Sequence, residues 1–349
     1  MFWIVGADAI ANRLLAHSTS PFLVALRENF DHFEWEGFHF YDLIMPLFLF
    51  MIGVSMTFSY SKRLQRGDSK RLILRHVMIR VMVLTFLGTM IDGNLLTYDI
   101  HKLQMPYSVL FVLSLGYLVA SIILLNLKFT WQIVTTASLL LIYWLIQTFA
   151  PAPGHIIGVY SPGTTFGDWL NERVMGNWQG EFHRPWIVAM TTYGSTAMLG
   201  VFAGHVLRSG KNQRDKLLWL IALGIFCLMV GWAWSYQFPI IKKPWTSTYV
   251  LVAGGWSFLL LALFYLVIDV WGFHRWSFPF KIIGMNAIAA YMSWKLFGPV
   301  FHRVAAVFTE GISKDVAPSN YQLIEAVGAM LVLWIMLYSM YRKGVFLKI

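Results

Sequence analysis

The chain has 349 residues, of which 58% are hydrophobic and only 13% charged, and its mean hydropathy is +0.60. A typical soluble domain is about 25% charged, so the composition predicts a polytopic membrane protein and excludes a disordered chain or a disulfide scaffold. The single cysteine, Cys227, excludes an internal disulfide and a cysteine-ligated metal cluster. The net charge of +10 is typical of proteins that bind nucleic acid, but basic residues also collect at the cytosolic ends of membrane helices. The positions of the basic residues decide between these two explanations.

In chain order, the first apolar segment runs from Met1 to about Leu15 and carries Asp8, Asn12 and Arg13. It is too short to span a bilayer, which predicts a re-entrant piece or a helix truncated at its N-terminus. Nine runs of spanning length follow, near 41–61, 72–92, 105–125, 129–150, 187–208, 216–236, 246–270, 278–302 and 322–342. We therefore predict an all-α bundle of about ten transmembrane helices that forms one transmembrane domain over 1–349.

Basic residues gather at alternate connections between these runs. Sixteen Lys and Arg residues lie on one side and nine on the other, so the positive-inside rule places both termini in the cytosol. The basic charge therefore reflects membrane topology, and we expect no nucleic acid partner. The sequence has no N-x-S/T acceptor, which favours a bacterial inner membrane over a glycosylated luminal face. Three long loops, 16–40, 92–104 and 151–186, lie on the outer side.

The first outer loop holds the densest polar cluster of the chain, which begins Asp31-His32-Phe33-Glu34-Trp35-Glu36 and ends at Asp42. A histidine can serve as base, acid or nucleophile near neutral pH. A nearby carboxylate such as Asp8 or Asp42 would fix its tautomer and stabilise the imidazolium. An interfacial loop whose histidine and Trp35 belong to an aromatic belt explains the same residues.

Other known site patterns are absent. The ten histidines form no HExxH motif and no paired ligand spacing, so we expect no metal. The GxSxG, GxGxxG and P-loop patterns are also absent. Arg75 and Arg80 lie on the cytosolic half of their predicted helix, where anchoring to lipid phosphate is one explanation.

Two distant stretches together resemble the heparan-alpha-glucosaminide N-acetyltransferase family and its bacterial relatives. The first is His32-x-x-Trp35-x-Gly37 followed by Tyr41-Asp42-Leu43-x-x-Pro46-x-Phe48-x-Phe50-x-x-Gly53-x-Ser55. The second is the run from Pro239 to Val250, followed by Gly284-Met285-Asn286-Ala287-Ile288, with Leu199–Gly204 as a weaker match. These matches occur in family order over nearly the whole chain.

The resemblance implies a multi-helix transferase that moves acetyl from cytosolic acetyl-CoA to an amino sugar or glycan terminus on the periplasmic side. It also implies a homodimer. His32 matches the family's catalytic histidine, and Asp42 matches the aspartate after the histidine loop. Asp8 falls where relatives carry an asparagine or an acidic residue in the first helix, close enough to assist the histidine. We expect the coenzyme, as co-substrate, to contact Arg75, Arg80, Ser247 and Asn286. We expect the acceptor to contact Trp35, Lys242 and Trp245.

Alternatives remain open at the level of the sequence. His32 either accepts the acetyl group itself or acts as a general base within a ternary complex. An O-acyltransferase of a lipid or polysaccharide shares the same general plan. A small-molecule transporter would use the same buried polar residues as a path, and a catalytically silent scaffold is the last alternative.

Overall fold

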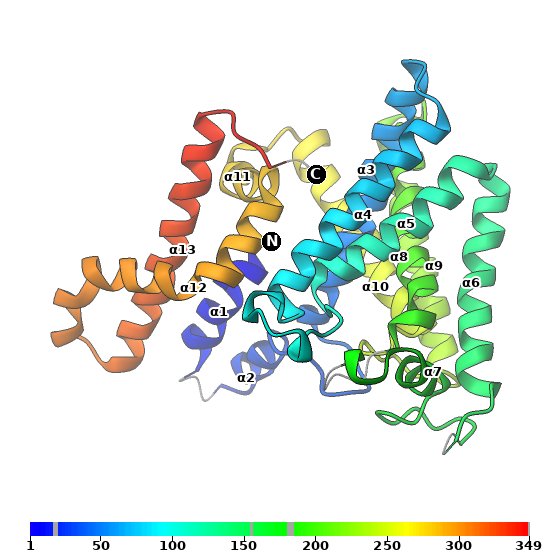
Figure 1. Ribbon diagram of the computed structural model, residues 1–349. Helices are drawn as coiled ribbons and strands as arrows, with labels where there is room; N and C mark the ends of the chain where they lie inside the picture. Colours follow the sequence, from blue (N-terminus) through cyan, green and yellow to red (C-terminus); the bar gives the residue numbers. More distant parts are fainter. Residues whose placement is uncertain (17–19, 154–155, 180–184, 348–349) are drawn as a thin grey trace. The chain divides into compact units, whose positions relative to one another are not determined.

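The computed structural model describes residues 1–16, 20–153, 156–179 and 185–347 (Figure 1). The regular structure in these ranges is helical, and β-pairing within them is limited to one isolated antiparallel bridge between Glu36 and Ile241. The described part of the chain therefore has the all-α fold class that the sequence predicts.

Eight helices in the described ranges are long and apolar enough to cross a membrane. Such helices satisfy every backbone hydrogen bond internally, which the hydrocarbon core requires. They are α3 (Ile44–Gln65, preceded by the turn Phe40–Leu43), α4 (Lys70–Asp92), α5 (Val109–Asn126), α6 (Phe129–Phe149), α8 (Trp186–Arg208), α9 (Gln213–Ser235), α10 (Ser247–Phe264, extended by a π-helical turn at Tyr265–Val270) and α13 (Pro318–Arg342). The chain is a helical membrane protein.

The predicted run at 278–302 is not one continuous helix. It is divided into α11 (Phe278–Met285) and α12 (Ala287–Thr309) at Asn286, whose backbone is non-helical at φ −123° and ψ 42°. The opening segment is divided as well, into a π-helical turn (Trp3–Ala7) and α1 (Asp8–Leu15). Neither segment is among the eight spanning helices, so the structure does not reproduce the predicted count of about ten.

The long connections contain short helices. The first holds α2 (Pro21–Glu28), which begins with proline at its first position. The third holds α7 (Phe166–Met175), where Thr165 and Asp168 form a reciprocal capping box. Single turns lie at Leu95–Thr97, Ile100–Lys102, Gly176–Gln179, Arg275–Ser277 and Glu310–Lys314. Parts of the predicted loops 16–40 and 151–186 lie outside the described residues.

The chain divides into two units. The smaller unit comprises 1–32, 39–41 and 272–349, and the larger comprises 33–38 and 42–271. The core of the smaller unit forms where α12 and α13 pack together, around Ile282, Leu333 and Leu337. Gly6 is required here, because its φ of +114° suits glycine and a Cβ would lie 2.8 Å from the Trp294 ring.

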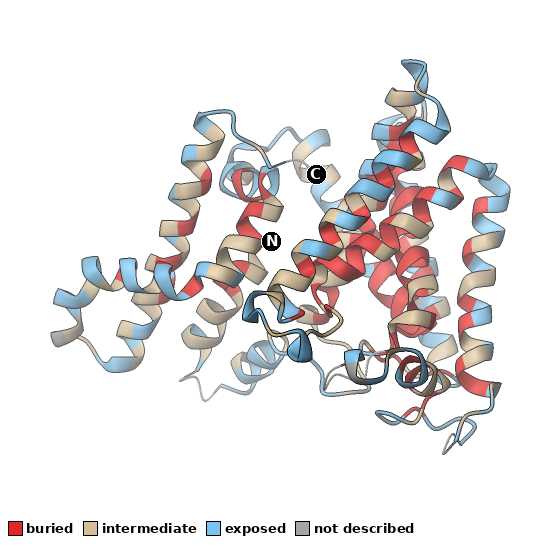
Figure 2. Cartoon of the chain, in the orientation of Figure 1, coloured by how far each residue is buried: buried red, intermediate tan, exposed pale blue. Residues whose placement is uncertain are grey.

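The core of the larger unit is built on α8, which is the most buried of the eight spanning helices (Figure 2). α3 and α8 approach until their backbones touch: a Cβ on Gly53 would lie 1.9 Å from the Ala197 carbonyl oxygen, and one on Gly200 would lie 1.8 Å from that of Phe50. Small residues permit this contact, and close packing is what holds helices together where lipid removes the hydrophobic driving force.

The α3–α8 contact generates a stability prediction. We expect Gly200→Ala to lower the free energy of unfolding by about 1–3 kcal/mol or more, because the new methyl group meets backbone that cannot rotate away. Thermal unfolding of the detergent-purified protein measures the effect. Gly210→Ala is the matched control, since a Cβ there meets no atom within 4 Å. Equal unfolding midpoints for the two variants would contradict the prediction.

Candidate active site

The predicted catalytic histidine lies in the turn after α2, in the smaller unit, and its side chain is exposed. Asn29 shapes this turn: its backbone oxygen accepts from the Tyr41 amide at 3.0 Å and its side-chain oxygen from the Phe40 amide at 3.3 Å. Tyr41 is thereby held beside His32, with 4.6 Å between the ring centroids. The imidazole is supported by an aromatic ring while it stays accessible to small molecules.

Asp8, the first residue of α1, meets the same tyrosine. The Tyr41 hydroxyl donates to Asp8 Oδ2 at 2.7 Å. The structure therefore links two of the three predicted catalytic residues, His32 and Asp8, through Tyr41. The sequence analysis missed Tyr41 as a site residue, although it stands directly before Asp42 in the first matching stretch. A phenol between a carboxylate and an imidazole can position both groups.

A second set of contacts ties the histidine turn to α1. Asn12, one turn after Asp8, donates from Nδ2 to Asp31 Oδ1 at 3.2 Å. The Asp31 carbonyl oxygen lies 3.0 Å from His39 Nδ1, which donates when that nitrogen carries the proton. Asp31 directly precedes His32, so these bonds restrict the backbone that carries the imidazole.

Asp42, the third predicted catalytic residue, belongs to the larger unit and is buried there. Lys242 Nζ lies 3.1 Å from Asp42 Oδ1, and the Phe33 amide donates to Oδ2 at 3.2 Å. The Tyr249 hydroxyl donates to the Asp42 carbonyl oxygen at 2.7 Å. A charge removed from water requires such partners. The carboxylate consequently holds the residue that follows His32 and pairs with Lys242; its predicted role in orienting the imidazole stays a prediction.

The loop 239–246 before α10, part of the second matching stretch, is fixed by its own polar groups. Thr246 caps α10, and its hydroxyl donates to the Pro239 carbonyl oxygen at 2.9 Å. Trp245 has a left-handed φ of +58° and donates from Nε1 to Thr196 on α8 at 3.0 Å. The Ser247 hydroxyl donates to the Leu140 carbonyl oxygen at 2.7 Å. Both predicted ligand contacts, Trp245 and Ser247, are buried in this structure and use their polar atoms within the protein.

Trp35, another predicted acceptor contact, is half-buried. Its Nε1 donates to the Tyr160 carbonyl oxygen at 2.6 Å, and Lys243 lies 5.4 Å from the centre of its ring. Burial raises the pKa of the Tyr160 phenol more than the hydrogen bond with Thr148 lowers it, so this phenol is neutral at physiological pH. Trp35 and the exposed Lys243 together present an aromatic and cationic surface within the larger unit.

The predicted coenzyme contacts differ in their exposure and in their hydrogen-bond partners. Arg75 is exposed on α4. Arg80, further along α4, stacks 4.8 Å above the Tyr117 ring, and its buried Nε has no hydrogen-bond partner within the described residues. Asn286 is fully buried in the smaller unit: its Nδ2 donates to the Val345 carbonyl oxygen at 3.1 Å, and its Oδ1 accepts from the Leu347 amide at 3.0 Å.

No group of three or more His, Cys, Asp or Glu side chains within the described ranges is arranged to hold a metal ion. The donors near His32 are instead arranged as hydrogen-bonding pairs. Such groups suit proton transfer and positioning.

Comparisons with known proteins give distant relatives. No family model matches the chain. The chain is 26% identical to heparan-alpha-glucosaminide N-acetyltransferase of Mus musculus and 25% identical to that of Homo sapiens, and each match covers 92% of this chain and 56% of the relative. The chain thus spans about half the length of the curated relatives it matches, and it is distantly related to them, in agreement with the resemblance seen in the sequence.

The buried ion pair generates a prediction. We expect Lys242→Met to destabilise the protein by up to about 3–5 kcal/mol, because the buried Asp42 carboxylate loses its cationic partner. Asp42→Asn combined with Lys242→Met should recover part of that loss. Thermal unfolding midpoints measure both variants. Lys243→Met is the control, since the neighbouring lysine is exposed; a loss at Lys243 as large as that at Lys242 would contradict the assignment.

Proposed function

We propose that this chain, as a distant relative of heparan-alpha-glucosaminide N-acetyltransferases, is a transmembrane acetyltransferase that moves the acetyl group of acetyl-CoA to an amino sugar or glycan terminus. The observation that carries the proposal is the accessible imidazole of His32, supported by Tyr41, which is itself hydrogen-bonded to Asp8. A scaffold protein would not need a histidine fixed in this way.

The chemistry assigned to His32 is proton transfer. Its neutral imidazole takes the proton of the acceptor amine as the amine nitrogen bonds to the acetyl carbonyl carbon. Collapse of the adduct breaks the carbon–sulfur bond, and the imidazolium returns the proton to the departing thiolate. The alternative is a two-step route in which the imidazole nitrogen first takes the acetyl group and then gives it to the amine. Tyr41 and Asp8 position the ring in either route.

The donor is a charged nucleotide thioester, which cannot cross hydrocarbon. We assign its phosphates to Arg75 and Arg80 on α4, of which Arg80 has an unpaired Nε within the described residues. The contacts of the coenzyme with Ser247 and Asn286, and of the acceptor with Trp35, Lys242 and Trp245, stay predictions from the sequence.

We further propose the membrane arrangement that the basic residues favour. Both termini lie in the cytosol of a bacterial inner membrane, acceptor and His32 lie on the periplasmic side, and the divided segments at 1–15 and 278–309 complete about ten membrane segments. The single-domain organisation and the homodimer likewise stay predictions.

The first test of the function is His32→Ala. We expect acetyl transfer to fall by at least about 10²-fold to 10⁴-fold, the usual contribution of a general acid–base group, with an unchanged unfolding midpoint. Tyr41→Phe, which retains the ring and loses the bond to Asp8, should reduce the rate less. His101→Ala alters another exposed histidine and serves as control. Normal turnover in His32→Ala would refute the assignment.

Labelled acetyl-CoA without acceptor separates the two routes. Under the general-base route, which we favour, no stable acetylated protein accumulates. Label that is retained by the wild-type protein and lost in His32→Ala would require the covalent route instead. Analysis of the product, as amide or ester, distinguishes N-acetylation from O-acylation.

The donor site is tested by charge reversal. We expect Arg80→Glu and Arg75→Glu each to raise the KM for acetyl-CoA by about tenfold, with kcat less affected, because a like charge then faces the phosphates. Lys343→Glu places the same change on another exposed basic residue and should leave the KM unchanged. Unchanged kinetics in both α4 variants would remove these arginines from the site.

A further inference from the structure

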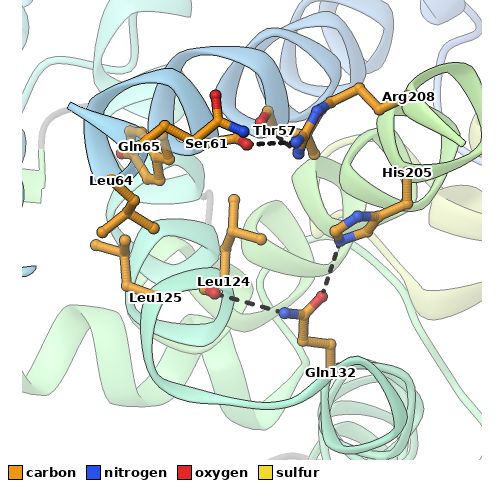
Figure 3. Close-up of a pocket in the computed structure, with 10 residues that line it drawn as sticks. Thr57, Ser61, Leu64, Gln65, Leu124, Leu125, Gln132, His205 and Arg208 are labelled. Carbon is orange, nitrogen blue, oxygen red and sulfur yellow. Dashed lines mark hydrogen bonds between the residues drawn. The ribbon is translucent and has the colours of Figure 1, made fainter. Parts of the chain in front are cut away.

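A cavity of about 460 Å³ lies in the larger unit where α3, α5, α6 and α8 come together (Figure 3). Cavities of about 300–1,000 Å³ are the usual size for small-molecule ligands. The cavity residues lie toward the ends of α3, α5 and α8 and the start of α6, away from loop 239–246 at the start of α10. It contains none of the residues assigned to acetyl transfer above.

One wall of this cavity is cationic. Arg208, the last residue of α8, donates from Nη1 to the Thr57 carbonyl oxygen at 2.9 Å and from Nη2 to the Ser61 hydroxyl. A guanidinium has five N–H donors, so these two bonds orient the group and leave donors for a ligand. Within the described residues no carboxylate pairs with Arg208.

A second polar pair stands beside the arginine. Gln132, near the start of α6, donates from Nε2 to the Leu127 carbonyl oxygen at 2.9 Å, so its Oε1 faces His205 Nε2 at 3.3 Å. The oxygen is an acceptor, and His205 Nε2 therefore carries a proton toward it. This pair fixes the His205 ring about one turn before Arg208.

The rest of the lining and its surroundings favour an anion with an apolar part. Leu64, Leu124 and Leu125 form the apolar wall, and none of the described residues that line the cavity is Asp or Glu. The two turns at this end, 62–71 and 208–216, carry many Lys and Arg residues. Their carboxylates are Asp68, which is paired with Arg63 at 2.8 Å, and Asp215. Such an excess of positive charge concentrates anions at the mouth of a cavity.

We propose that this cavity is a binding site for a phosphate-bearing molecule, with the phosphate on Arg208 and Ser61 and the apolar part against Leu64, Leu124 and Leu125. The planar guanidinium matches two phosphate oxygens at once. A soluble nucleotide phosphate and the headgroup of an anionic lipid share this chemistry. The inference does not depend on acetyl transfer, because the variants that test it alter this cavity and leave Arg75 and Arg80, the residues assigned to the donor phosphates, unchanged.

The test compares a variant that places one negative charge at the mouth of the cavity with a variant of nearly the same size that carries no charge. Leu64 is an exposed wall residue outside the hydrogen-bond network, so Leu64→Glu and Leu64→Gln differ in charge at nearly equal size. The probes are adenosine 3′,5′-bisphosphate added to the detergent-purified protein, and nanodiscs of phosphatidylglycerol compared with phosphatidylcholine. The readout is the unfolding midpoint as a function of probe concentration or lipid fraction.

We expect at least one probe to stabilise the wild-type and Leu64→Gln proteins, and Leu64→Glu to weaken that effect by about tenfold or more. Stabilisation by the bisphosphate that Leu64→Glu weakens identifies a soluble ligand of this cavity, and stabilisation by phosphatidylglycerol alone that Leu64→Glu weakens identifies a lipid. Arg208→Lys, which keeps the charge without the planar group, should also weaken the effect, whereas Arg214→Gln at the same end should not. The proposal is overturned if neither probe stabilises the protein or if Leu64→Glu and Leu64→Gln respond equally. Such a failure leaves acetyl transfer untouched, since the activity of His32 is measured separately.

Discussion

The ion pair of Asp42 and Lys242 constrains the larger unit where α10 begins, because it fixes the loop 239–246 against the start of α3. A carboxylate that is 1% exposed is costly unless its charge is matched, so the residues around it have little freedom. Lys242 brings the loop 239–246 to Asp42 at the entrance of α3, and the Phe33 amide brings the chain that follows His32. One pair of charges therefore joins segments that lie 200 positions apart in the sequence.

The other polar side chains of the candidate active site are also fixed by hydrogen bonds within the protein. Trp245 and Ser247 use their polar atoms to fix the loop and α10 against α6 and α8, and Tyr41 uses its hydroxyl on Asp8. Buried polar groups must be satisfied, and satisfied networks are rigid. His32 differs from these groups because its side chain is exposed, while the Tyr41 ring lies 4.6 Å from it between centroids.

α8 provides one polar contact near its middle and another at its C-terminal end. Thr196 receives the Trp245 bond, while Arg208 closes the helix at the cavity. Twelve residues of α-helix separate them, a distance of about 18 Å along the axis. The close contact of α3 with α8 at Gly53 and Gly200 lies in this stretch, so tight packing between Thr196 and Arg208 holds both positions in place.

The sequence by itself determined the class of protein and most of its spanning helices, because the bilayer demands about 20 apolar residues for each crossing and any hydropathy count detects them. It also singled out His32, because a histidine among carboxylates is conspicuous in an apolar chain. Only the tertiary structure decided that Asn286 divides the run at 278–302, since hydropathy does not register backbone conformation. Tertiary structure likewise decided that Tyr41 links His32 to Asp8, and that Arg208, His205 and Gln132 share one cavity. Their partners come from separate helices, and the spacing of residues along the chain does not encode which helices pack together.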